Sequence, residues 1–430
     1  MADFDPHAYA VSLTKTGHLA SDGQLLYSWY ENHWKMLDDE AGERSAYRWL
    51  VDHDRGNVSP RNARAAHRAA ILWAPPLPEQ TQEVVIPCRN GYVVFESGRL
   101  VLRPAKPAMG LHHVLSCEYQ PEFGVPQRFQ KFLEQVLPDT DVCARVQEYA
   151  GYTLTADARH QLAQLWLGTG ANGKGVLANI LQELHGQVAA VCLDELDGFR
   201  LSVLLGASLI YCDEIPRARI NEQLLKSMIA GERVQIDRKY REPLSIRLRG
   251  KWLVLGNHLP AITDHSAGFW RRWDIVPFTV TIPESERDPQ LAHQIIQHEL
   301  SGVLNWALAG LVRLEQRGTF DAVIPQAMQK VVFDAKLETN SVLAWYEESG
   351  IRIALDAETP KDSVFLHYRQ WCERNGLSAM ASPRFWTRLR DVIPVEESRR
   401  RFGEQQIRMC NVQLPRLLEH PSAFIRARTF

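Results

Sequence analysis

A glycine-rich stretch at residues 165–177, LWLGTGANGKGVL, limits what this chain can fold into more than any other feature. Its apolar start is typical of a buried strand, and the apolar residues after the glycines recur at helical spacing. A glycine turn between a strand and a helix N-terminus presents backbone N–H groups that bind phosphate. The stretch therefore predicts an α/β domain that binds a nucleotide.

The same stretch fits two phosphate-binding fingerprints. Gly168, Gly170 and Gly173 satisfy G-x-G-x-x-G, the turn used by dinucleotide-binding domains. Gly168, Gly173 and Lys174 satisfy G-x-x-x-x-G-K, in which the lysine reaches the β- and γ-phosphates of a nucleoside triphosphate. Under the second interpretation the nucleotide-binding residues are Gly168, Thr169, Gly170, Ala171, Asn172, Gly173, Lys174, Gly175 and Val176.

The dinucleotide interpretation expects an acidic residue about 20 residues after the glycines, at the end of the next strand. Asp194 and Glu195 stand there. This fingerprint does not require Lys174, however, and acidic residues at strand ends are common. A dinucleotide-dependent oxidoreductase is therefore the distant alternative, and a comparison of NAD and ATP uptake would exclude it.

The triphosphate interpretation expects a second strand that ends in acidic residues, and LIYCDE at 209–214 has this pattern. Asp213 would bind Mg²⁺ directly or through its water shell, and Glu214 would polarise the water that attacks the γ-phosphate. A solvated acid pair is the simpler interpretation of these two residues taken alone. Combined with the glycine–lysine loop, they favour ATP and Mg²⁺ as the cofactors.

Two further segments favour an ATPase. A buried-type strand at 252–256 ends at Asn257, whose amide can lie between the catalytic water and the γ-phosphate. Arg271 and Arg272 lie among aromatic residues in GFWRRW at 268–273, and such a guanidinium can stabilise charge that develops during phosphoryl transfer. Either segment could serve packing alone, but chance hardly explains four such elements in this order.

The residues of these motifs and their order along the chain resemble those of superfamily 3 helicases. Within this superfamily they are most similar to the phage and plasmid primase-helicase group related to the poxvirus primase-helicase. The similar segments are NGKG at 172–175, LLKSMIAGERVQIDRKYREP at 224–243, GNHLP at 256–260 and FWRRW at 269–273. The similarity extends upstream through IPCRNGYVVFESGRL at 86–100 and residues 126–151, and downstream to SVFLHYRQWCERNG at 363–376. It covers most of the chain.

This resemblance implies a homohexameric ring around single-stranded or forked DNA. A hairpin at residues 235–248 would line the central channel, with Arg238 and Lys239 near its tip as DNA-binding residues. Six copies would give a positive channel despite the formal net charge of −2. The implied catalytic residues are Lys174 at the phosphates, Asp213 and Glu214 as the acidic pair, Asn257 as the sensor, and Arg271 or Arg272 as an arginine finger reaching the neighbouring subunit.

The chain departs from the pattern at two points. Gly175 stands where the loop normally carries a Ser or Thr that ligates Mg²⁺. No segment resembles the catalytic carboxylates or zinc-binding motifs of a primase, so a separate primase or other replication proteins are the expected partners.

The expected fold class is an α/β motor domain, similar to AAA+ P-loop domains and built on a mainly parallel sheet. We expect an α+β N-terminal domain at 1–125, helical over its first 75 residues and with short strands at 84–102. A helical collar-like segment at 126–160, the ATPase domain at 161–330 and a winged-helix-like domain at 331–430 would follow. The last would contain a hairpin around Gly403.

Basic residues gather in two places. Residues 232–251 contain seven basic and three acidic side chains. The second place contains Arg384, Arg388, Arg390, Arg399, Arg400, Arg401 and Arg408. For either cluster alone, a solvated surface is as good an explanation as a polyanion site.

Two patterns bear on the compartment. No apolar run approaches the roughly 20 residues of a membrane span, and the N-terminus lacks a signal-peptide pattern, so we expect a cytoplasmic protein without a membrane partner. The seven cysteines form no C-x-x-C pair, which makes a zinc site or a disulfide framework unexpected.

The sequence predicts an ATP-dependent replicative DNA helicase of a phage, plasmid or integrated element, which translocates on one strand as a ring. The alternative is an ATP-controlled DNA-binding initiator or regulator without processive unwinding. DNA-stimulated ATP hydrolysis and strand displacement would separate the two.

Overall fold

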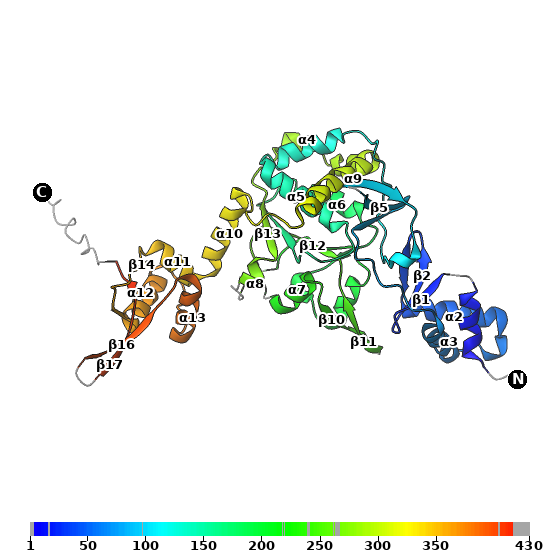
Figure 1. Ribbon diagram of the computed structural model, residues 1–430, viewed down its shortest axis with the longest axis horizontal. Helices are drawn as coiled ribbons and strands as arrows, with labels where there is room; N and C mark the ends of the chain where they lie inside the picture. The colour runs from blue at the N-terminus through cyan, green and yellow to red at the C-terminus, as the bar shows by residue number, and fades with distance from the viewer. Residues whose placement is uncertain are drawn as a thin grey trace. The chain divides into compact units, whose positions relative to one another are not determined.

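The structure is a computed structural model (Figure 1), and it describes residues 4–15, 18–96, 98–216, 218, 220–238, 241–260, 262, 267–402 and 405–415. The chain divides into two compact units, Met1–Val331 and Val332–Phe430. Among the helices of the described ranges, none is both long enough and apolar enough to cross a bilayer.

A five-stranded parallel sheet forms the centre of the first unit, with the strand order β13-β7-β12-β9-β8. Every residue of β12 is buried, as expected for a parallel strand covered on both faces. The expected mainly parallel sheet is therefore confirmed. The strands are β7 (Ala163–Leu167), β8 (Val188–Ala190), β9 (Leu209–Cys212), β12 (Lys251–Gly256) and β13 (Trp273–Pro277).

Helices α4, α5, α6 and α9 gather on one side of this sheet, while α7 lies on the other (Figure 1). One apolar core joins Phe132 and Val136 of α4, Leu177 of α6, Leu308 of α9 and Trp166 of β7. The segment before the glycine loop is therefore part of the same packed body as the sheet. The helices of this body are α4 (Gln127–Val136), α5 (Thr140–Thr153), α6 (Lys174–Leu184), α7 (Glu222–Ile229), α8 (Ala267–Trp270) and α9 (Leu291–Arg317).

Two polar contacts tie α5 to the sheet. The Tyr149 hydroxyl donates to the backbone oxygen of Trp252 at 2.6 Å. The guanidinium of Arg145 donates to both carboxylate oxygens of Asp274, at 2.6 and 3.0 Å, and both side chains are buried. A buried charge pair with two such bonds fixes geometry more than it adds stability, so β12 and β13 are held in register with α5.

The N-terminal region corrects one expectation. Residues 19–37 form a three-stranded antiparallel sheet rather than helices. Trp29 lies opposite Trp34, with ring centroids 5.5 Å apart, and aromatic residues favour strands because such cross-strand pairs stabilise them. The elements are α1 (Pro6–Thr14), β1 (Leu19–Ser21), β2 (Leu26–Tyr30), β3 (His33–Leu37), α2 (Asp39–His53) and α3 (Pro60–Trp73).

The short strands expected at 84–102 are confirmed as an antiparallel meander of β4 (Val85–Cys88), β5 (Gly91–Glu96) and β6 (Arg99–Arg103). The Tyr92 hydroxyl donates to the backbone oxygen of Asn32 at 2.6 Å. The Trp34 indole donates to the backbone oxygen of Pro107 at 2.8 Å. The first bond connects the two N-terminal sheets, and the second connects the first sheet to the segment after β6.

The second unit has its own aromatic core, in which Tyr368 stacks on Phe385 with centroids 4.6 Å apart and Trp345 packs edge-on against both. Strands β15, β17 and β16 form its sheet. The paired strands expected around Gly403 are present, while Gly403 itself lies outside the described residues. The elements are α10 (Gln326–Thr339), which crosses the boundary between units, α11 (Ser341–Glu348), β14 (Arg352–Ile353), β15 (Thr359–Pro360), α12 (Lys361–Arg374), α13 (Ser382–Val392), β16 (Glu397–Phe402), β17 (Gln405–Cys410) and β18 (Val412–Gln413).

Candidate nucleotide-binding site

The strand order brings three distant segments to one edge of the sheet. Strand β12 lies between β7 and β9, with Gly256 beside Leu167 and Val254 beside Cys212. The glycine loop, Asn257 and the Asp213–Glu214 pair therefore follow three neighbouring strands at their carboxyl ends. Open α/β sheets bind ligands at this edge.

The same strand order argues against a dinucleotide site. Strand β8, which precedes Asp194 and Glu195, is the edge strand and is separated from β7 by β12 and β9. In dinucleotide-binding sheets the second strand lies directly beside the first, so that its acidic residue reaches the ribose. Glu195 instead forms an ion pair with Arg200, with an N–O distance of 3.4 Å.

The backbone of the glycine loop is shaped to hold an anion. Gly170, Ala171 and Gly173 have positive φ angles of 107°, 52° and 79°. Helix α6 begins at Lys174, and Gly173 at its N-cap position provides no capping side chain. The N–H groups of the first turn, which such a side chain would normally satisfy, can therefore donate to phosphate.

A buried asparagine anchors this loop, and the sequence did not single it out for that role. The Asn172 amide donates to the backbone oxygen of Phe278, just after β13, at 3.2 Å. The backbone N–H of Ile282 also donates to the Ala171 oxygen at 2.8 Å. A Cβ at Gly168 would lie 2.0 Å from the Asn172 amide nitrogen, so this close approach requires glycine.

Gly173 connects the loop to α4. A Cβ at this position would lie 2.5 Å from a methyl carbon of Val136 and 3.0 Å from the ring of Phe132. Its positive φ of 79° excludes an unstrained side chain for a second reason. Helix α4 is therefore packed directly against the phosphate loop.

Lys174 is placed by two acceptors. Its ammonium donates to the Gly168 backbone oxygen at 2.8 Å and to the Asn257 side-chain oxygen at 2.9 Å. An ammonium has three donors, so one remains for a phosphate oxygen. Burial lowers the pKa of Lys174, and the nearby charge of Asp213 opposes this shift.

The acidic pair lies at the exposed end of β9. The Tyr211 hydroxyl donates to one oxygen of Asp213 at 2.6 Å. Burial, and next the bond to Asp213, raise the pKa of Tyr211, so the phenol stays protonated and remains a donor. Tyr211 orients Asp213 and is a second residue whose role the sequence did not reveal. Glu214 is exposed at the same strand end.

A Mg²⁺ ion beside this loop would take few ligands from the protein. Within the described ranges, no three His, Cys, Asp or Glu side chains form a metal cluster. A Cβ at Gly175 would meet no atom within 4 Å, so the space beside the loop is open. Asp213 would then be one ligand among phosphate oxygens and waters, an arrangement that Mg²⁺ accepts readily.

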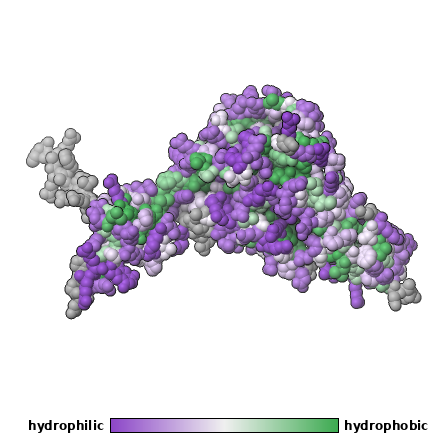
Figure 2. Space-filling model, in the orientation of Figure 1, coloured by the Kyte–Doolittle hydropathy of each residue, from purple (hydrophilic) through white to green (hydrophobic). Residues whose placement is uncertain are grey.

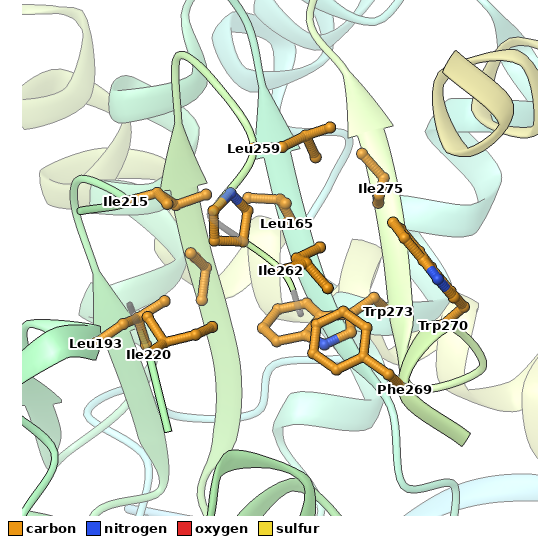
Figure 3. Close-up of a pocket in the computed structure, with 12 residues that line it drawn as sticks. Leu165, Leu193, Ile215, Ile220, Leu259, Ile262, Phe269, Trp270, Trp273 and Ile275 are labelled. Atoms are coloured by element: carbon orange, nitrogen blue, oxygen red, sulfur yellow. The ribbon is translucent and has the colours of Figure 1, made fainter. Parts of the chain in front are cut away.

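The aromatic residues around the two arginines pack against the sheet. Figure 3 shows Phe269, Trp270 and Trp273 at an apolar pocket that Leu165 and Ile262 also line. The Phe269 ring lies 5.7 Å from that of Trp270 and 6.2 Å from that of Trp273. These aromatics anchor the segment that carries the arginines.

Arg271 and Arg272 lie at the amino-terminal ends of the strands, whereas the glycine loop lies at their carboxyl ends. The backbone oxygen of Arg272 accepts from the N–H of Ala163, at the start of β7, whereas the glycine loop follows the end of β7. The five residues of that strand span about 16 Å. Arg272 is partly buried and donates to the Gly268 oxygen, while Arg271 is exposed.

The expected hairpin before the sensor strand is present. Strands β10 (Arg233–Arg238) and β11 (Arg241–Arg247) pair antiparallel, with a register shift between Ile236 and Arg238. Lys239 lies outside the described residues, and only the backbone of Arg238 is described. The DNA-binding roles of these two residues stay predictions.

Comparisons with known proteins find relatives of two segments. Residues 166–272 match a family of unknown function, DUF5906. Residues 338–424 match the poxvirus D5 protein-like family. A putative helicase of Acanthamoeba polyphaga mimivirus, L207/L206, is 25% identical over 158 residues, which cover 34% of this chain and 16% of that protein.

Similar solved structures include two apo forms of the NrS-1 C-terminal region. Their TM-scores are 0.54 and 0.55, at 13% and 15% identity, and the alignments cover 95% of this chain and all of theirs. At this identity they show a shared fold. The C-terminal segment is therefore similar to poxvirus D5-like proteins, and the viral relative, of which the match covers only a small part, is named a putative helicase.

Proposed function

We propose that this chain is an ATP-dependent DNA helicase of the superfamily 3 type, with an AAA+-like motor. The observation that carries the proposal is the bond between the Lys174 ammonium and the Asn257 oxygen, at 2.9 Å. This bond joins the glycine loop to the end of β12, and β12 lies beside β9, the strand that precedes the acidic pair. A lysine and an amide are thus in contact at the edge of the sheet that also carries Asp213 and Glu214, which supports a site for triphosphate hydrolysis.

Each side chain has a separate task in this proposal. Lys174 neutralises charge on the β- and γ-phosphates, and Glu214 orients a water and accepts its proton. Asn257 would hold the same water, and its side-chain oxygen already accepts from the Lys174 ammonium. Asp213, which accepts from the Tyr211 hydroxyl, would hold Mg²⁺, and the ion would supply positive charge against the charge that develops on the transferred group.

DNA would pass through a homohexameric ring lined by the hairpin of β10 and β11, with Arg238 and Lys239 facing one strand. The C-terminal unit, with helices followed by a hairpin, would serve as a winged helix. A phage, plasmid or integrated element is the proposed setting, with a separate primase as a partner. The resemblance in residues 224–243 and 256–273 supports these assignments.

ATP hydrolysis with and without single-stranded DNA, together with displacement of a labelled strand from a fork, tests the function. A helicase gives DNA-stimulated hydrolysis and ATP-dependent displacement. Nucleotide-dependent assembly on DNA without displacement would instead identify an ATP-controlled initiator. Electron microscopy with forked DNA and a non-hydrolysable ATP analogue would show whether a ring encloses a strand.

Arg271 is expected to act on the ATP of the neighbouring subunit, because the length of β7 separates it from its own phosphate loop. A Lys174→Ala subunit still offers Arg271, and an Arg271→Ala subunit still binds ATP. Mixing the two inactive proteins should restore hydrolysis at up to about a quarter of the interfaces in a head-to-tail ring. The steady-state ATPase rate of the mixture measures this recovery.

The matched control replaces Arg271→Ala with the double variant Lys174→Ala/Arg271→Ala, which leaves no intact loop lysine and should restore nothing. Subunit exchange is verified with differently tagged chains. Mixed rings without recovered hydrolysis would contradict an action across the interface.

Gly175→Ser is expected to lower the Mg²⁺ concentration for half-maximal hydrolysis by about two- to tenfold, because its hydroxyl adds one oxygen ligand. The new Cβ has no neighbour within 4 Å, so the loop can accept it. Gly175→Ala adds the same Cβ without the hydroxyl and should leave the Mg²⁺ requirement unchanged. A wild-type ring that holds ATP with Mg²⁺ and never cleaves it, with or without DNA, would contradict the motor hypothesis.

A further inference from the structure

A buried ion pair lies close in sequence to the proposed arginine finger. Figure 2 shows a visible surface that is mostly hydrophilic, as expected when charged side chains stay in water. Arg145 of α5 and Asp274 of β13 depart from this rule, because only 7% of the arginine and 3% of the aspartate are exposed. Asp274 stands three residues after Arg271. The pair therefore lies at the base of the segment that carries the finger.

Stability does not account for this pair. Removing two charges from water is costly, and a buried ion pair is often no more stabilising than apolar side chains of similar volume. The pair does supply geometry, because the Arg145 guanidinium donates to both carboxylate oxygens of Asp274, at 2.6 and 3.0 Å. Two such bonds fix the orientation of both groups. A positional role is therefore the better explanation.

Arg145 is itself held by further contacts. Its guanidinium donates to the backbone oxygen of Asp321 at 3.2 Å and lies over the Phe320 ring, 4.5 Å from the ring centroid. Helix α5, which carries Arg145, belongs to the main apolar core through Val146. Asp274 is therefore bonded to a side chain whose own position is fixed.

Strand β13 depends on such a contact because it is the edge strand of the sheet. Its hydrogen-bonded neighbour is β7, from Trp273 beside Ala163 to Pro277 beside Leu167. On the other side of β13, no strand of the described chain pairs with it. The bond from α5 therefore limits how far the amino-terminal end of β13, and Arg271 before it, can move.

We infer that Arg145 is a positioning residue for catalysis at the neighbouring subunit's ATP, because it holds Asp274 and thereby the segment that carries Arg271. The inference rests on the proposed function and names the part of the fold that places the finger. A misplacement of about 1 Å can cost about 10²-fold in rate when a group must stabilise charge on a transferred phosphoryl group. A small shift of β13 would thus leave the fold intact and the finger ineffective.

The test uses mixed rings of full-length chains, with Lys174→Ala in the donor subunit and Arg271→Ala in the acceptor subunit, so that hydrolysis reports on the donor's finger. The donor then receives Arg145→Met together with Asp274→Leu. Replacing both partners leaves no unpaired buried charge, so thermal unfolding should stay close to that of the parent donor. The maximal ATPase rate per mixed interface, counted with differently tagged chains, should fall at least about tenfold. The ATP concentration for half-maximal rate should not change, because the acceptor's loop is intact.

The same two substitutions in the acceptor subunit give the reciprocal arrangement. The acceptor has no finger, so its hydrolysis should be retained if the pair acts through Arg271. A loss confined to this arrangement would show that the pair acts on the phosphate loop of its own subunit, and it would overturn the inference.

Glu148→Gln in the donor is the matched control. Glu148 is a buried carboxylate of the same helix, but its ion pairs, with Arg313 at 3.4 Å and Arg317 at 2.5 Å, lead to α9 instead of β13. The rate should therefore stay that of the parent donor. Equal losses in this control and in the apolar pair would contradict the inference, as would equal rates for the parent donor and the folded apolar-pair donor.

Arg145→Lys serves as the second donor variant if the apolar pair does not fold. It keeps the charge but loses the planar group that makes two bonds to Asp274, so the maximal rate should still fall. An unchanged rate with Arg145→Lys and with the apolar pair would overturn the inference. Mixed rings in which even the parent donor restores nothing would instead contradict the action of Arg271 across the interface, which is a failure of the proposed function and of the inference with it.

Discussion

Lys174→Ala is expected to reduce ATP hydrolysis by at least about 100-fold, because the phosphate loop loses its only cation. The ammonium holds Gly168 and Asn257 and keeps a third donor for the nucleotide. Neither a backbone N–H nor a water supplies a full positive charge at that position. Release of phosphate under saturating ATP, with and without single-stranded DNA, measures the effect.

Lys131 supplies the control for this substitution, since it is an exposed lysine on the neighbouring helix α4. Lys131→Ala should retain the wild-type rate. Thermal unfolding of the Lys174→Ala protein shows whether the loop still folds. A well-folded Lys174→Ala protein that hydrolyses ATP at the wild-type rate would refute the assignment of this loop as the catalytic site.

Glu214→Gln is expected to leave ATP bound but uncleaved, with single-turnover hydrolysis about 10²- to 10⁴-fold slower than in the wild type. Glutamine has the shape of glutamate but accepts no proton, so the attacking water loses its base. The exposed position of Glu214 at the end of β9 means that the fold should tolerate the change. Filter binding of labelled ATP, followed by separation of ADP, distinguishes binding from cleavage.

Glu195→Gln is the matched control, because Glu195 belongs to the other fingerprint that the glycine loop satisfies. It is exposed and follows the edge strand β8, which two strands, β12 and β9, separate from β7. The substitution should leave ATP hydrolysis unchanged. Normal turnover by Glu214→Gln would show that another residue orients the water.

Local patterns predicted the elements of the motor well. The apolar runs before Gly168, Asp213 and Asn257 are the strands β7, β9 and β12, and the apolar residues after Lys174 form α6. Each of these elements depends on residues close in sequence. Periodicity therefore suffices to locate it.

Residues 19–37 show where local patterns fail. From the sequence alone, their aromatic residues are compatible with a helix. The structure shows strands instead, in which Trp29 and Trp34 pack against each other across a strand pair. The sequence alone also does not reveal that Asn172 anchors the glycine loop or that Tyr211 orients Asp213. Asn172 acts through the backbone of Phe278, 106 residues later, and no spacing rule connects the two.

The residue pattern by itself determined that a glycine loop lies between a strand and a helix, and it predicted phosphate binding with either of two ligands. Only the tertiary structure favours one of them, because it places β12 between β7 and β9 and leaves β8 at the edge. That order brings the Asn257 oxygen to 2.9 Å from the Lys174 ammonium, although the two residues are 83 positions apart in the sequence. It also leaves two strands, β12 and β9, between β7 and the strand that precedes Asp194 and Glu195. The loop could be predicted from the sequence because glycine conformation and helix capping depend on adjacent residues. Strand order depends instead on how whole helices and strands share one core.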